Sequence, residues 1–176
     1  MTKRNNGALA IGIVIVIVAA LVAIFTQSRT FAQAMGQGYA PEKVDSVHVY
    51  LQAMGHDAPS REVVLSGEDP AAQELLALLG SQTYDVGYEV GAIEGHAVPL
   101  DYTITLILTM ELEPEEEGAS AAFLYFDGSD EATMDGLDRA AGSNGWVRTH
   151  YRADLAFQQE VLDLLLAQPY EEVQEA

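Results

Sequence analysis

The side chains of this sequence best suited to acid–base or metal chemistry are four histidines: His48, His56, His96 and His150. An imidazole group changes its charge near neutral pH and is the commonest metal ligand in proteins. Asp57 follows one of them and Glu94 precedes another by two residues, but no two histidines have the i, i+4 spacing of a zinc site on a helix. We interpret all four as surface histidines; a pair that the fold brings together with a carboxylate is the alternative.

A second candidate is the acidic stretch DGSDEATMDGLD, which covers residues 127–138. Calcium prefers hard oxygen ligands. Here the oxygens would come from five side chains: Asp127, Ser129, Asp130, Glu131 and Asp135. The Asp-x-Asp-x-Asp-Gly spacing of an EF-hand is absent, and Asp-Gly is a common turn sequence. We expect a solvated loop without a metal, and calcium binding is the alternative.

Motifs for covalent catalysis are missing. The chain has no cysteine, no Gly-x-Ser-x-Gly sequence and no Ser-x-x-Lys sequence. With 27 acidic residues, neighbouring carboxylates arise without catalysis, and the single tryptophan, Trp146, is a poor basis for a sugar-binding cleft. We predict a protein that is not an enzyme, with no catalytic residue and no cofactor. A hydrolase of the cell envelope that uses carboxylates or a histidine is the alternative.

The charge of the chain restricts its partners. From Thr30 onward there are five basic and 27 acidic side chains, a formal net charge of −22. Such a domain repels phosphate backbones and anionic lipid headgroups. We therefore exclude nucleic-acid binding, whereas cations and basic proteins remain compatible partners.

An apolar segment, GALAIGIVIVIVAALVAIF, precedes the elements that must position these residues. It covers residues 7–25 and contains no charge, amide or proline. Nineteen helical residues reach roughly 28 Å, about the thickness of the hydrocarbon core of a bilayer. Lys3 and Arg4 stand before the segment and Arg29 alone lies just after it. The positive-inside bias predicts a single transmembrane helix with the N-terminus in the cytoplasm and the remaining chain outside.

Cleavage of this segment during export is a second possibility. Ala32-Gln33-Ala34 has the small-x-small pattern that a signal peptidase cuts, here after Ala34. The apolar run is longer than the core of an ordinary signal peptide, and the pattern lies well beyond its end. We therefore favour an uncleaved signal anchor, with a secreted domain as the alternative.

The rest of the chain predicts one α+β domain. We divide the sequence into a cytoplasmic N-terminus with a transmembrane helix (1–25), a linker (26–43), an extracytoplasmic domain (44–168) and a loose tail (169–176). Apolar periodicity predicts strands and two helices, the helices at 68–80 and 153–169, where Asp-Pro starts the first and proline ends the second. The expected strands are 44–52, 61–66, 83–90, 100–112, 121–126 and 146–153. Consecutive strands indicate one mainly antiparallel sheet, with the two helices covering one face and a threonine-rich face turned to water.

Four stretches of the sequence carry a resemblance: KRNNGALAIGIVIVIVAALVAIF, SGEDPAAQELLALL, FLYFDG and YRADLAFQQEVLDLLL. In this layout the chain resembles small membrane-anchored extracytoplasmic proteins of unknown function from Gram-positive bacteria. The resemblance implies a membrane anchor and a compact α+β domain, and it implies no activity.

These observations favour a binding or interaction module outside the membrane, anchored by one helix. An accessory subunit of a membrane complex is a further alternative. A binding module should expose an apolar or aromatic patch, whereas an enzyme should gather polar groups and histidines in one pocket.

Overall fold

The computed structural model describes residues 11–19, 28–36, 39–54, 58–86, 100–110, 121–128, 131–136 and 148–173. Residues 11–19 are helical. None of the helices in this described part of the chain has the length and apolar character that a bilayer crossing needs. Several predicted features lie outside the described residues: His56, His96, Ser129, Asp130 and the two ends of the apolar segment.

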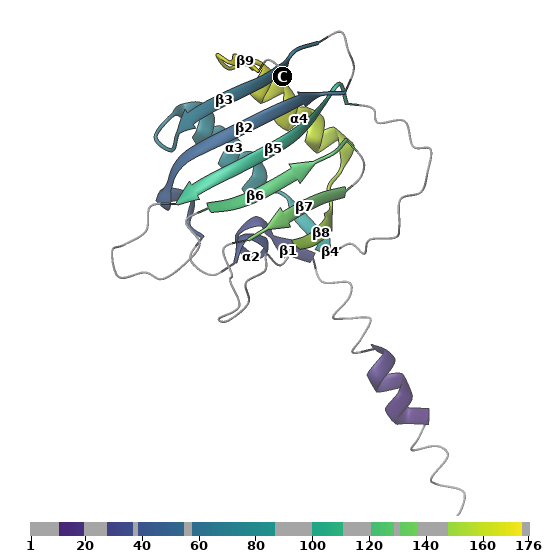
Figure 1. Ribbon diagram of the computed structural model, residues 1–176. Coiled ribbons are helices and arrows are strands. Elements are labelled where there is room, and N and C mark those ends of the chain that lie inside the picture. Colours follow the sequence, from purple (N-terminus) through teal and green to yellow (C-terminus); the bar gives the residue numbers. More distant parts are fainter. Residues whose placement is uncertain are drawn as a thin grey trace, which may run out of the picture.

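The fold is α+β, as the sequence predicts, and it is built on one large antiparallel sheet (Figure 1). Nine strands of the described chain pair in the order β1-β4-β8-β7-β6-β5-β2-β3-β9. Every neighbouring pair is antiparallel. The strands are β1 (Ser28–Thr30), β2 (Val44–Ala53), β3 (Ser60–Ser66), β4 (Thr83–Val86), β5 (Tyr102–Met110), β6 (Ala121–Phe126), β7 (Glu131–Asp135), β8 (Arg148–Arg152) and β9 (Glu171–Val173).

The central strands form because their apolar residues alternate with polar ones, which places one set on each face of the sheet. In β2 and β5 the inward set includes Val49, Ile104 and Leu106, none of which has solvent-exposed surface. Their partners across the register are equally buried, so Val49 pairs with Leu106 and Leu106 pairs with Leu124. A shift of one residue would turn these side chains to solvent, and burial therefore fixes the register.

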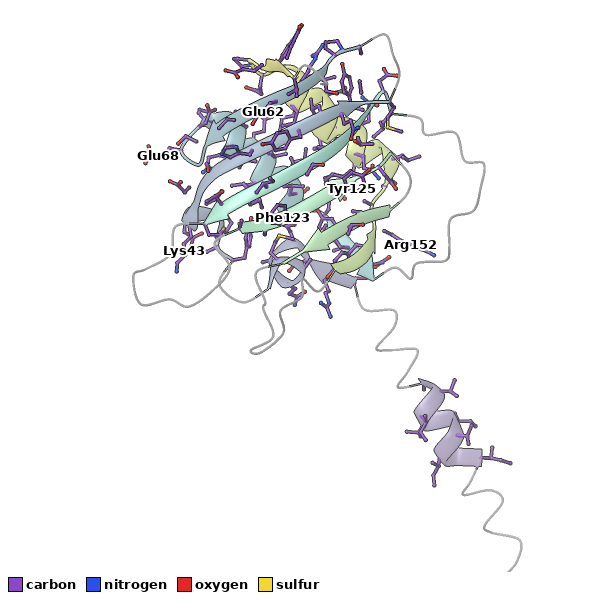
Figure 2. The ribbon with its side chains drawn as sticks, viewed as in Figure 1. Lys43, Glu62, Glu68, Phe123, Tyr125 and Arg152 are labelled. Carbon is purple, nitrogen blue, oxygen red and sulfur yellow. The ribbon has the colours of Figure 1, made fainter. Side chains whose placement is uncertain are left out.

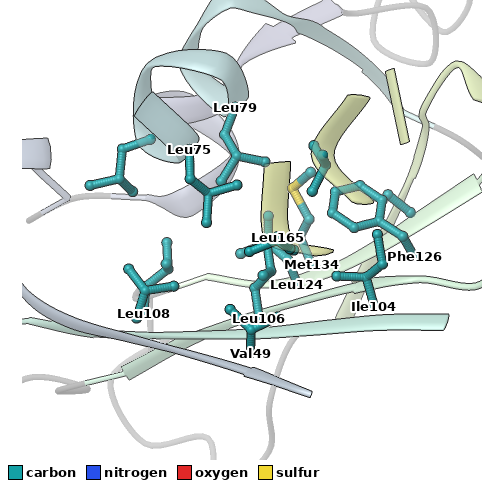
Figure 3. Close-up of a cluster of buried hydrophobic side chains, with 14 of the residues drawn as sticks. Val49, Leu75, Leu79, Ile104, Leu106, Leu108, Leu124, Phe126, Met134 and Leu165 are labelled. Atoms are coloured by element: carbon teal, nitrogen blue, oxygen red, sulfur yellow. The ribbon is translucent and has the colours of Figure 1, made fainter. Parts of the chain in front are cut away.

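Two helices cover one face of the sheet, α3 (Pro70–Ser81) and α4 (Leu155–Leu166) (Figure 1). Asp69 caps the first turn of α3 by accepting a hydrogen bond from the backbone N–H of Ala71 at 2.8 Å, and Asp154 caps α4 in the same way. Figure 3 shows the core between the layers, where α3 contributes Leu75 and Leu79 and α4 contributes Leu165.

One polar side chain is enclosed in this core. Gln158 of α4 is fully buried, and its amide accepts a hydrogen bond from the backbone N–H of Gly128 and donates one to the carbonyl of Ala153. Both groups that it satisfies lie at strand ends, where the ladder supplies no partner. The side chain therefore ties the start of α4 to the end of β6.

Residues 26–43 are not the simple tether that the sequence predicts. Their described part forms β1, the short helix α2 (Phe31–Met35) and a 3₁₀ turn, η1 (Pro41–Lys43). Phe31 and Met35 lie in the main core, with 1% and 0% of their surface exposed. A Thr30–Gln33 capping box starts the helix. The i, i+4 spacing of the two apolar residues places both on one side of α2, which is why so short a helix packs on the domain.

Two other predictions were also wrong. The described part of the tail is ordered as β9, which pairs with β3. The long polar stretch after β6 contains β7, whose Ala132 and Met134 point into the core with 1% of their surface exposed. Both strands were missed because charged and turn-forming residues dominate their composition.

Candidate binding surface

The face of the sheet opposite α3 and α4, here called the open face, carries two aligned rows of side chains. Figure 2 views this face, with Glu62, Phe123 and Tyr125 labelled on it. Strand register sets the first row, which runs from β9 to β8: Glu171, Glu62, Tyr50, Thr105, Tyr125, Thr133 and His150. The second row lies beside it: Val64, His48, Ile107, Phe123, Asp135 and Arg148.

Aromatic and aliphatic side chains gather at the centre of these rows. Tyr50, Val64 and Tyr125 expose 39%, 57% and 41% of their surface, and Ile107 and Phe123 are half-buried. We call these five residues the aromatic patch. Adjacent strands lie about 4.8 Å apart, so the two tyrosines, on strands separated by β5, stand roughly 10 Å apart. Contiguous apolar surface of this kind on a monomer marks an interaction site more often than a structural one.

Acidic residues border the patch on the β3 and β9 side. The hydroxyl of Tyr50 donates a hydrogen bond to the carboxylate of Glu62, and this bond, followed by the charge of Glu62, raises the pKa of Tyr50. Glu171 lies directly opposite Glu62 across the β3–β9 pair. The tyrosine therefore stays neutral at physiological pH, next to two carboxylates.

On the other side of the open face, at β4, β7 and β8, basic and acidic residues are cross-strand neighbours. Arg152 of β8 lies between Asp85 of β4 and Glu131 of β7 in the register, and Arg148 is opposite Asp135. Each described arginine position on β8 thus has an acidic neighbour across the sheet. At the β3–β9 end, by contrast, Glu62 and Glu171 are opposite each other.

The two histidines within the described chain lie on this face but do not meet. His48 of β2 is half-buried and points away from the helices, as the alternation predicts. His150 of β8 is four strands away in the sheet order, which is roughly 19 Å at the usual strand spacing. The strand order therefore places the two residues on separate parts of the sheet.

The acidic stretch that suggested calcium binding is divided between two strands. Asp127 follows β6, whereas Glu131 and Asp135 are the first and last residues of β7. Four residues of strand separate the α-carbons of that pair by roughly 13 Å, unlike the compact loop that surrounds a calcium ion. Among the residues that the structure describes, no three acidic or histidine side chains are grouped closely enough to hold a metal.

The aromatic patch was not predicted as a site from the sequence. The alternation in AAFLYF does place Phe123 and Tyr125 on one face of a strand, and Ile107 is the apolar exception on the threonine-rich face of residues 101–109. Their union with Tyr50 depends on the pairing of β2 with β5 and of β5 with β6. No local pattern encodes that pairing.

Comparison of the chain with protein-family models, with curated proteins and with solved structures finds no match. The function is therefore inferred from the surface of the domain itself.

Proposed function

We propose that the chain is a single-pass membrane-anchored module that binds a partner outside the cytoplasm through the aromatic patch. The observation that carries the proposal is the exposure of Tyr50, Val64 and Tyr125 at the centre of a sheet face that neither α3 nor α4 covers. Exposed tyrosines supply large rigid contact area at a low cost in conformational entropy, which is why they are common in binding surfaces.

The anchor in this proposal is the apolar segment at residues 7–25, retained rather than cleaved. Cleavage after Ala34 would remove β1 and separate Phe31 from a core in which it is 99% enclosed. A domain that needs these residues is better served by a signal anchor than by a removed signal peptide. The charge bias around the segment favours a cytoplasmic N-terminus and an extracytoplasmic domain.

Binding is favoured over hydrolysis for a geometric reason. A hydrolase that uses histidine needs the imidazole within hydrogen-bond reach of a reacting group and of a second polar group. The cross-strand neighbours of His48 on the open face are Val64 and Ile107, and neither of them supplies that second polar group.

An accessory subunit of a membrane complex is the second candidate. The observation in its favour is that β1 begins at Ser28, only three positions after the apolar segment ends. So short a connection would hold the domain close to the bilayer, where the aromatic patch could meet the outer part of a membrane partner.

The test is site-specific photo-crosslinking of the full chain in native membranes. A photoreactive residue replaces Val64 or Tyr125 on the open face, and Glu160, exposed on α4, serves as the matched control position. We expect one crosslinked species at both open-face positions and none at Glu160. Equal labelling at all three positions, or none at either open-face position, would refute the proposal. The intact mass from the same preparation reports whether the chain begins before residue 7 or at Met35.

A further inference from the structure

Negative charge is concentrated at one end of the aromatic patch, and its arrangement carries an inference about the partner. Glu62 and Glu171 are direct cross-strand neighbours on the open face. Like charges in directly opposite positions destabilise an antiparallel pair. The β3–β9 pair therefore keeps an unfavourable contact that a cation placed between the two carboxylates would relieve.

The nearest basic residue in the sequence does not supply that cation. Arg61 precedes Glu62, so its side chain leaves the strand on the opposite face. There its guanidinium carbon lies 4.1 Å from the ring centroid of Tyr170 and 5.6 Å from that of Tyr102. Stacking against these two rings keeps the guanidinium of Arg61 on the helix-covered side of the sheet. In the β3–β9 register Arg61 is opposite Glu172, not Glu171.

An aromatic ring completes this end of the patch. Tyr50 is the neighbour of Glu62 on the other side, and its hydroxyl donates to that carboxylate. A cation at the two carboxylates would therefore also lie near a tyrosine ring, which attracts it through the ring quadrupole. Beyond Tyr50 the row continues over Thr105 to Tyr125, so charged and apolar contacts follow one line across the sheet.

We propose that the aromatic patch docks an extended segment of a partner protein in which a lysine or arginine is followed two and four positions later by apolar residues, so that all three side chains leave the segment on the same face. Its cationic side chain lies between Glu62 and Glu171 beside Tyr50, and its apolar side chains cover Phe123 and Tyr125. This inference rests on the proposed binding function and adds the chemistry of the occupant.

Charge selects this occupant over others. A second copy of the chain brings the same surplus of acidic residues, 27 against five after residue 29, and would be repelled. Anionic polymers are repelled for the same reason. A neutral glycan fits aromatic platforms and can donate hydroxyl hydrogen bonds to a carboxylate, but it leaves the repulsion between two carboxylates in place, whereas a basic segment relieves it and also contacts the rings.

The experiment measures binding of three fluorescent peptides with blocked ends to the full chain in neutral detergent micelles. They have the sequences Lys-Ser-Phe-Ser-Phe, norleucine-Ser-Phe-Ser-Phe and Glu-Ser-Phe-Ser-Phe, so that length and aromatic content stay constant and the first residue shares a face with both phenylalanines. A chitin-type oligosaccharide tests the glycan alternative. The protein variants are Glu62→Gln, Glu171→Gln and their combination, with Glu172→Gln as the control on the other face of the same strand. Thermal unfolding of each variant verifies that it folds.

We expect the lysine peptide to bind most tightly, and the double variant to weaken it roughly fivefold, the effect of two exposed charge contacts. Glu172→Gln should leave its affinity unchanged, and added salt should reduce the affinity for wild type more than for the double variant. Equal affinity for wild type and the double variant would overturn the inference, as would tighter binding of the norleucine peptide or the oligosaccharide.

Failure of the inference and failure of the proposed function can be told apart with Tyr125→Ser. If this variant loses binding of the norleucine peptide or the oligosaccharide, the patch is a binding surface for an occupant of different chemistry. If no probe responds to Tyr125→Ser and membrane crosslinking from Val64 is also absent, the patch is not a binding surface.

Discussion

The ring of Phe31 packs against the ring of Tyr84, with centroids 5.9 Å apart, and thereby joins α2 to β4. The ring of Tyr39 meets the ring of Phe31 edge-on, with centroids 5.1 Å apart. The ring of Tyr84 also lies near those of Tyr151 and Phe157, with centroid distances of 6.1 and 6.3 Å. This chain of rings runs from the N-terminal segment through the sheet to α4. The region that the sequence suggests as a linker is therefore part of the core.

Phe31→Ala should destabilise the domain by about 3–5 kcal/mol, because it removes a buried ring and leaves a cavity beside Tyr84. Urea denaturation of the full chain, followed by tyrosine fluorescence, measures the change. Glu74→Ala, at an exposed position of α3, is the control and should shift the free energy of unfolding by less than about 0.5 kcal/mol. A small effect of Phe31→Ala would mean that residues 28–35 are an appendage.

Replacing Gly67 and replacing Gly80 by alanine should change the stability of the domain in opposite directions. A β-carbon on Gly67 would lie 1.7 Å from the carbonyl oxygen of Val44, a backbone atom that cannot yield cheaply, so Gly67→Ala should lower stability by several kcal/mol, on the order of other overpacking changes. A β-carbon on Gly80 meets nothing within 4 Å. Because Gly80 is an exposed residue of α3, Gly80→Ala should raise stability by about 0.5–1 kcal/mol. Thermal unfolding of both variants tests the two predictions. A higher melting temperature for Gly67→Ala would contradict the close approach of Gly67 to the backbone of Val44.

The buried Tyr84 and the half-buried Tyr39 predict a loss of stability at alkaline pH. Burial, with a smaller contribution from Glu42, raises the pKa of Tyr39 to about 12 from 10.0, and burial raises the pKa of Tyr84 as well. The unfolded chain releases these protons first, so the stabilisation is complete below pH 10 and is lost above it. For Tyr39 the loss falls between about pH 10 and 12. Tyr39→Phe should reduce the slope of unfolding free energy against pH in this window; an unchanged slope would contradict the assignment.

Removing the hydroxyl group of Tyr84 and removing that of Tyr39 should have different effects on stability at neutral pH. The hydroxyl of Tyr84 donates to the carbonyl of Leu79 at 3.0 Å, so Tyr84→Phe should cost about 1 kcal/mol. The hydroxyl oxygen of Tyr39 is buried without a hydrogen-bond partner in the described structure. Removing an unsatisfied polar group is neutral or stabilising, and Tyr39→Phe should therefore leave the unfolding midpoint in urea equal or higher. A lower midpoint for Tyr39→Phe than for Tyr84→Phe would reverse this ranking.

Glu171→Gln should stabilise the sheet edge by about 0.5 kcal/mol, because it removes the like-charge contact with Glu62. Glu172→Gln, the neighbouring change on the other face, removes a carboxylate opposite Arg61 and should not stabilise. Thermal unfolding at low ionic strength gives the comparison. A stabilising effect that persists at 1 M salt would show that charge repulsion is not its cause.

Much of the fold follows from periodicity in the sequence. Long apolar alternation predicts β2, β5 and β6, and leucine spacing with Asp caps predicts α3 and α4. The elements that were missed, β1, α2, β7 and β9, have three to five residues each, and so short a run displays a period only weakly. In β7 the sequence EATMD does alternate, but turn residues on both sides concealed it. The i, i+4 spacing of Phe31 and Met35 is too weak a pattern to predict a helix by itself, and α2 is stabilised by the burial of these two side chains in the core.

The candidate surface was less predictable than the fold. The alternation within each strand shows which of its residues share a face, and in β2 it separates His48 from the buried Val47 and Val49. It does not reveal which strands become neighbours. Glu62 and Glu171 are 109 positions apart in the chain and meet through an edge pairing that the loose-tail prediction did not include. The charge of the sequence therefore indicates which partners are compatible, and the strand order supplies the surface that we propose for them.

The first and last strands of the described sheet occupy its two opposite edges. Eight strand intervals separate them, which is roughly 38 Å measured across the sheet. If residues 7–25 fasten the chain to a bilayer, the sequence joins this anchor to the sheet at its β1 edge, and the rim that carries Glu62 and Glu171 lies at the opposite edge. A partner bound at that rim would then occupy the end of the strand order farthest from the anchored segment.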